Sequence, residues 1–94
     1  MEIRQTEEFR DWLRRLRDEK AKARIVARIR RLELENLGDT RSLGGGLAEM
    51  RIDYGPGHRL YFVRQGIAVL LLCGGDKKGQ QRDITRARAL MKEV

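Results

Sequence analysis

The feature that most constrains this chain is an unbroken apolar run, Ile67-Ala68-Val69-Leu70-Leu71-Leu72-Cys73, which ends at Gly74-Gly75. The run is far shorter than the ~20 apolar residues that cross a bilayer, so we expect no membrane span. It also lacks the strict alternation of a strand with one solvated face. It therefore predicts a strand that is buried on both faces or lies at the centre of a sheet. With 94 residues, the chain has room for one domain, residues 1–94.

Two alternating segments precede this run and predict partner strands. Apolar side chains in residues 48–54 alternate with Glu49, Arg51 and Asp53. In the next segment Leu60 and Phe62 alternate with polar neighbours. The Gly-Pro-Gly turn and Gln65-Gly66 connect these segments as hairpins, so we expect a three-stranded antiparallel meander. Residues 39–46 are expected to be a turn-rich flexible connector, and His58 a solvent-facing turn residue.

Helical periodicity appears at both ends of the chain. Residues 7–17 follow the cap Thr6, a second helix follows Asp18 and ends before Gly38, and residues 80–93 form a third. Residues 2–5 fit an edge or joining strand. The predicted fold class is α+β, with an N-terminal helical hairpin packed on one face of a small, mainly antiparallel sheet and a C-terminal helix.

Charge points to a class of partner. The chain carries 21 Lys+Arg against 14 Asp+Glu, a net charge of +7, and ten of its basic residues lie between Arg10 and Arg31. Such a field attracts nucleic acid, anionic lipid or an acidic protein. The block is therefore predicted to be a surface for a polyanion or an acidic partner.

The alternation of side chains along the predicted strands places further cations on one face of the sheet. If the apolar members of each strand face the helices, Arg51, Arg59 and Tyr61 face the other side of the sheet. Two neighbouring arginines need an anion between them. That anion is either a carboxylate such as Glu49 or Asp53, or a bound phosphate, which matches the planar guanidinium fork.

Several kinds of chemistry lack the residues they need. His58 is the only histidine and Cys73 the only cysteine, so neither a metal site nor a nucleophilic triad is predicted, and no cofactor is expected. What remains is phosphodiester cleavage by positioning and charge. Lys77 and Lys78, just after the apolar strand, would complete a cationic bowl, and Tyr61 would orient or exchange a proton. On RNA, the substrate's own 2′-OH would be the nucleophile.

Three segments together resemble the HigB-like "addiction module killer" branch of the RelE/ParE toxin superfamily. They are Leu43-Gly44-Gly45-Gly46-Leu47-Ala48-Glu49-Met50-Arg51-Ile52, Tyr54-Gly55-Pro56-Gly57-His58-Arg59-Leu60-Tyr61-Phe62 and Leu70-Leu71-Leu72-Cys73-Gly74-Gly75-Asp76-Lys77-Lys78-Gly79-Gln80. The similarity covers nearly the whole chain. It implies a RelE-like fold and a small basic toxin of a type II toxin–antitoxin system, monomeric within a hetero-oligomeric complex with its cognate antitoxin.

The resemblance also implies residue roles. Arg59 corresponds to the arginine of the RelE Gly-X-Arg strand, Arg51 to a lysine on the preceding strand, and Lys77 and Lys78 to the closing basic pair. The tyrosine that RelE carries further on has no counterpart, because Ile84 lies there, so Tyr61 is expected to serve instead. The expected catalytic set is Arg51, Arg59, Tyr61, Lys77 and Lys78.

The function this implies is ribosome-dependent, metal-independent cleavage of mRNA, which inhibits translation and arrests growth. Arg24, Arg28 and Arg31 on the helical hairpin, with Lys77 and Lys78, would contact nucleic acid. The lone cysteine and the absence of an apolar leader indicate a cytoplasmic protein. The ParE branch gives the alternative, a non-enzymatic inhibitor of DNA gyrase.

Overall fold

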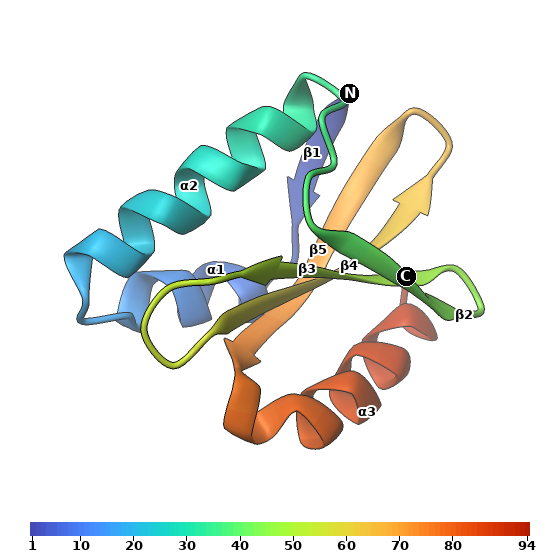
Figure 1. Ribbon diagram of the computed structural model, residues 1–94. Helices are drawn as coiled ribbons and strands as arrows, with labels where there is room; N and C mark the ends of the chain where they lie inside the picture. The colour runs from blue at the N-terminus through green and yellow to red at the C-terminus, as the bar shows by residue number, and fades with distance from the viewer.

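The computed structural model describes residues 1–94 and has an α+β architecture, with three α-helices and a five-stranded, mostly antiparallel sheet (Figure 1). The elements follow in the order β1 (Glu2–Gln5), α1 (Glu7–Arg15), α2 (Glu19–Glu33), β2 (Thr40–Gly44), β3 (Leu47–Ile52), β4 (His58–Gln65), β5 (Ala68–Asp76), the 3-10 turn η1 (Lys77–Gly79) and α3 (Gln80–Met91). The predicted class, the helical hairpin and the meander β3–β4–β5 are therefore confirmed. None of the three helices combines the length and the hydropathy that a membrane-spanning segment requires.

The sheet has the strand order β1-β5-β4-β3-β2. β1 pairs in parallel with β5, and every other pair is antiparallel. The expected flexible connector at residues 39–46 is wrong, because Thr40–Gly44 pairs with β3 and forms the edge strand. The segment looks like a loop in sequence because it is short and ends in three glycines with positive φ, which make the tight β2–β3 turn.

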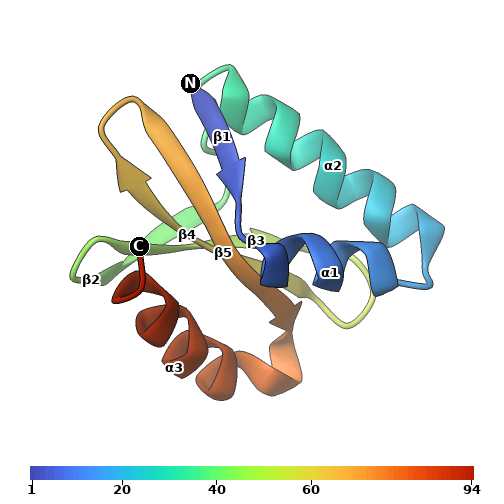
Figure 2. The ribbon, with the colours of Figure 1, turned by 180° about the vertical axis from the view of Figure 1, so that it is seen from behind.

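Helices cover both faces of the sheet, which corrects the expectation that they share one face. α1 and α2 lie on one side of the sheet and α3 on the other (Figures 1 and 2). On the first side, Phe9, Ile25 and Ile29 pack against Val69 and Leu71. On the other side, Ala87 and Leu90 of α3 belong to the cluster that contains Leu70 and Leu72. The physical reason is the apolar run itself, since both faces of β5 need cover.

A β-bulge in β5 turns two consecutive side chains toward the same face of the sheet. Tyr61 pairs with Cys73, but the next residue, Phe62, pairs with Leu71, so Leu72 is an extra residue on β5. As a result Leu72 and Cys73 both belong to the cluster beneath α3. The bulge explains why the apolar run shows no strict alternation at its end.

His58 is not a solvent-facing turn residue as expected. It begins β4 and is 7% exposed, with its ring 6.4 Å from that of Trp12. The turn between β3 and β4 ends one residue earlier, at Gly57, whose φ is +78°. The predicted start of β4 was therefore one residue too late.

Thr6 connects the first helix to the sheet. Its hydroxyl accepts a hydrogen bond from the backbone N–H of Phe9 (3.0 Å) and donates one to the carbonyl of Leu72 (2.6 Å). The backbone N–H of Thr6 also bonds the carbonyl of Leu71 (3.0 Å). Thr6 is thus both the N-cap of α1 and the residue that continues the β1–β5 pairing.

Replacing Thr6 with alanine should lower the free energy of unfolding by about 1–2 kcal/mol, because the helix loses its cap and Leu72 loses a donor. Urea denaturation followed by circular dichroism measures this. Thr6→Ser, which keeps the hydroxyl, is the matched control and should stay near wild type. Equal losses in both variants would contradict the assigned role of the hydroxyl.

Candidate functional site

Arg51 and Arg59 lie directly opposite each other on β3 and β4. They share the sheet face on which α3 packs, since the alternate residues Met50, Ile52 and Leu60 belong to the cluster beneath α1 and α2. Strand parity therefore placed these two arginines correctly with respect to the helical hairpin. α3 packs over β4, β5 and the Leu47 end of β3, and Arg88 of α3 donates to the backbone carbonyls of Leu43 and Gly44 on β2. The side chains that stay exposed on this face of β2 and β3 are those of Arg41 and Arg51.

Each of these arginines has a carboxylate partner. Nη2 of Arg51 lies 2.9 Å from Oδ1 of Asp39, in a pair that is about half exposed on both sides. Nη1 of Arg59 lies 3.2 Å from Oε1 of Glu49, and the Arg59 side chain is only 12% exposed. Of the two carboxylates considered from the sequence, Glu49 is a partner of Arg59, whereas the partner of Arg51 is Asp39 and not Asp53.

Glu49 is the centre of the polar contacts on this face. It is completely buried, and its carboxylate accepts three hydrogen bonds from three different elements. Nε of Arg41 on β2 (3.0 Å) and Nη1 of Arg59 on β4 (3.2 Å) reach Oε1, while Nε2 of Gln80 on α3 (2.8 Å) reaches Oε2. Neither Arg41 nor Gln80 stands out in the sequence, because each acquires its partner only when β2 and α3 are in place.

The surroundings of Glu49 determine its ionisation. Burial alone would raise the pKa of its carboxyl. The hydrogen bonds from Gln80 and Arg41, with the positive charges of Arg59 and Arg41, outweigh burial and lower that pKa below its ordinary value. Glu49 is therefore a buried anion at neutral pH.

Tyr61 is not on an open surface as expected. It is fully buried beneath α3, opposite Glu49 in the β3–β4 register. Burial and the negative charge of Glu49 raise the pKa of its hydroxyl well above the ordinary value. The hydroxyl lies beside the Glu49 carboxylate but makes no hydrogen bond of good geometry with it, and Nε of Arg59 and Oδ2 of Asp83 also lack partners. A polar interior thus lies under the start of α3.

Lys77 and Lys78 are both exposed on η1, directly after β5. The strand register brings them to the Arg59 end of the sheet, because Gly75 pairs with Arg59 and Asp76 with His58. Asp76 caps η1 by accepting a hydrogen bond from the backbone N–H of Gly79 (3.2 Å). The predicted basic pair therefore lies at the same end of the sheet as the two arginines.

The three arginines predicted on the helical hairpin differ in their surroundings. Arg28 donates to the backbone carbonyls of Arg51 (2.7 Å) and Leu37 (3.4 Å), so it ties α2 to the end of β3. The guanidinium of Arg24 lies 4.7 Å from the centre of the Tyr54 ring. Arg31 is exposed, and all three line a shallow cavity of about 210 Å³ that also contains Asp53. Arg28 has a structural role that its position in a basic block did not reveal.

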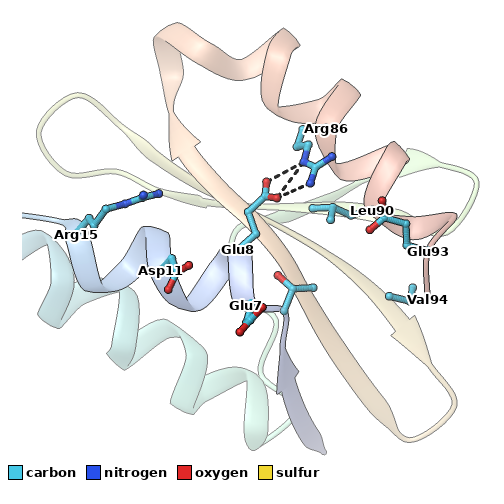
Figure 3. Close-up of a pocket in the computed structure, with 9 residues that line it drawn as sticks. Glu7, Glu8, Asp11, Arg15, Arg86, Leu90, Glu93 and Val94 are labelled. Carbon is cyan, nitrogen blue, oxygen red and sulfur yellow. Dashed lines mark hydrogen bonds and ion pairs between the residues drawn. The ribbon is translucent and has the colours of Figure 1, made fainter.

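A larger cavity, of about 470 Å³, lies between α1 and α3 and is mainly acidic (Figure 3). Glu7, Asp11 and Glu93 line it, and Glu8 and Arg86 pair across it at 2.6 Å. Its charge is unsuited to a phosphate, so we place the candidate site at the arginines. Nowhere in residues 1–94 do three His, Cys, Asp or Glu side chains gather to hold a metal ion.

Tyr61→Phe should leave the free energy of unfolding unchanged or raise it by up to about 1 kcal/mol. Removing a buried hydroxyl that has no partner also removes the cost of keeping it from water. Urea denaturation tests this. A loss of stability would show that the hydroxyl makes a hydrogen bond, for which Glu49 is the neighbouring acceptor.

Glu49 should make stability depend on pH in a defined direction. A lowered folded-state pKa adds stability above the unfolded pKa of about 4.3, and that stability disappears as pH falls through the lowered value. The difference in unfolding free energy between wild type and Glu49→Gln should therefore be largest near neutral pH and shrink in acid. Asp83, whose pKa is raised by burial, is present in both proteins and cancels. A pH-independent difference would contradict this assignment.

Comparison with known proteins defines the family. The chain matches the family described as phage derived protein Gp49-like (DUF891) over residues 11–92. An uncharacterized protein of Haemophilus influenzae is 46% identical over 95 residues, which cover 100% of this chain and 96% of that relative. No solved structure matches the chain. The chain belongs to the phage-derived Gp49-like family, a RelE-like family that resembles the toxins of toxin–antitoxin systems.

Proposed function

We propose that this protein is the toxin of a type II toxin–antitoxin system and that it cleaves mRNA on the ribosome. The observation that carries the proposal is the direct register of Arg51 and Arg59 on a sheet face that α3 leaves partly uncovered. Membership of the Gp49-like family supports the toxin assignment. The fold is proposed to be RelE-like, with residues 1–94 as one toxin domain.

The carboxylate partners leave most of the positive charge available. Arg41, Arg51, Arg59, Lys77 and Lys78 are five cations, against the two carboxylates of Asp39 and Glu49 that pair with three of them. The Arg51–Asp39 pair is half exposed, so its strength is small and a phosphate can replace Asp39. An arginine has five N–H donors; Arg59 uses one of them on Glu49 and its Nε–H is buried, so the donors that can meet a phosphate are the remaining ones on its two Nη atoms.

In the proposed reaction the 2′-OH of the substrate attacks the adjacent phosphorus and displaces the 5′ oxygen of the next nucleotide. Charge develops on the phosphate oxygens, where Arg51, Arg59, Lys77 and Lys78 would stabilise it. Proton exchange by Tyr61 stays a prediction, and the burial of its hydroxyl argues against it. The site would then act chiefly by positioning the RNA and by neutralising charge.

The remaining partners follow from this proposal. Arg24 and Arg31, on the hairpin surface, would contact ribosomal RNA, and Arg28 would hold the hairpin in place. A cognate antitoxin would cover the cationic face or the hairpin in a hetero-oligomeric complex, with the toxin as a monomer. Such a protein would work in the cytoplasm.

One observation favours the second candidate, a non-enzymatic inhibitor of DNA gyrase. Tyr61 is enclosed and His58 is buried, so the uncovered face has cations but neither of these proton-exchanging groups. A cationic face of this kind can bind a partner protein such as gyrase without cleaving RNA. Inhibition of gyrase supercoiling, with mRNA left intact in parallel, would select this candidate.

Arg59→Ala should reduce mRNA cleavage by about 10²–10³-fold, the usual effect of removing one donor to a developing oxyanion. Primer extension on mRNA from a translating extract measures the cut sites and their extent. Arg4→Ala, which removes an exposed arginine of β1, is the matched control and should cleave like wild type. Full cleavage by Arg59→Ala would place the reaction elsewhere.

A further inference from the structure

Glu49 is the one carboxylate in the chain that is fully buried. Withdrawing a charge from water is costly, and a buried ion pair often stabilises a fold no better than apolar residues of similar size. Glu49 lies on the face that carries Leu47 and Tyr61, where an apolar side chain would join the existing cluster. Stability alone therefore gives a weak reason for a carboxylate at this position.

The contacts of Glu49 suggest another reason. Arg41 and Arg59 come from strands on either side of β3, and one oxygen, Oε1, accepts from both. Without a negative charge between them, two guanidinium groups in this position would repel each other and turn apart. With the carboxylate in place, Arg41 is held through Nε and Arg59 through Nη1, and the other Nη donors of both side chains remain without a protein partner.

We propose that Glu49 is the positioning residue of the cationic site formed by Arg41, Arg51, Arg59, Lys77 and Lys78. This proposal rests on the function proposed above. Glu49 holds Arg59 and Arg41 so that their free N–H groups converge on one phosphate of the RNA. By this assignment Arg41 is a further phosphate-binding residue, on the half-exposed edge strand β2.

Gln80 extends the same arrangement to the lysines. It is the first residue of α3 and donates to Oε2 of Glu49 at 2.8 Å, directly after the turn that carries Lys77 and Lys78. The carboxylate is thus a common anchor for β2, β4 and the η1–α3 junction. A displacement of about 1 Å at such an anchor can cost on the order of 10²-fold in rate.

Glu49→Gln distinguishes positioning from simple electrostatics. The amide has nearly the same shape but removes a negative charge, so electrostatics alone predicts tighter RNA binding and undiminished cleavage. Positioning predicts that kcat falls by about 10–100-fold while the half-saturating concentration of ribosomes stays equal or decreases. Glu2→Gln, at an exposed glutamate of β1, is the matched control and should change neither quantity.

The experiment measures multiple-turnover mRNA cleavage over a series of concentrations of purified ribosomes, which gives kcat and the half-saturating concentration, and in parallel the arginine Nε–Hε signals by NMR. The NMR probe is a short single-stranded RNA with 2′-O-methyl groups, which cannot be cleaved through its 2′ positions. In the wild type, the probe should shift the signals of Arg41 and Arg59. In Glu49→Gln these responses should be lost although the probe still binds.

The two readouts separate the two proposals. Absence of cleavage by the wild type overturns the proposed nuclease, whereas the NMR response still decides the role of Glu49. Wild-type cleavage together with an unchanged arginine response in Glu49→Gln overturns positioning alone. If Glu49→Gln does not fold, Gln80→Met removes only the donor to Oε2 and should lower kcat roughly tenfold. Wild-type kcat in a folded Gln80→Met would then overturn the proposal.

Discussion

Burial of both faces of β5 determines where the other elements lie. Val69 and Leu71 require one covering layer, which α1 and α2 supply, and Leu70 and Leu72 require another, which α3 supplies. α3 follows β5 after the short turn η1 and packs over β4, β5 and the Leu47 end of β3, whereas the side chains of Arg41 and Arg51 stay exposed. The candidate site lies at the margin of this second layer, where Gln80 of α3 contacts Glu49 and the arginines of β2 and β3 reach the surface.

Much of the fold could be predicted because helical and strand periodicities are strong over the three helices and over β3, β4 and β5. Parity along β3 and β4 was also sufficient to put Arg51 and Arg59 on the face away from the hairpin. β2 could not be recognised, because five residues ending at a glycine turn have almost no pattern of their own. Its pairing depends on β3 and is a tertiary effect.

The site was predicted less completely, for a physical reason. Burial of Tyr61 and the contacts of Glu49 depend on where α3 packs, which no local pattern in β3 or β4 encodes. One signal was available: an apolar run without alternation implies cover on two sides, and Ala87 and Leu90 provide an apolar helix face for the second. The contact of Arg41 with Glu49 could not be predicted, because it depends on the pairing of β2 with β3.

The acidic cavity between α1 and α3 has a consequence for how the protein meets other molecules. It lies at the β1–β5 edge of the sheet, whereas Arg41 and Arg51 lie toward the β2 edge. The carboxylates of the cavity and these two arginines thus lie toward opposite edges of the sheet, in a chain whose net charge is +7. The carboxylates of the cavity repel a phosphate and the arginines attract it, so this local difference in charge disfavours RNA at the cavity and favours it at the arginines.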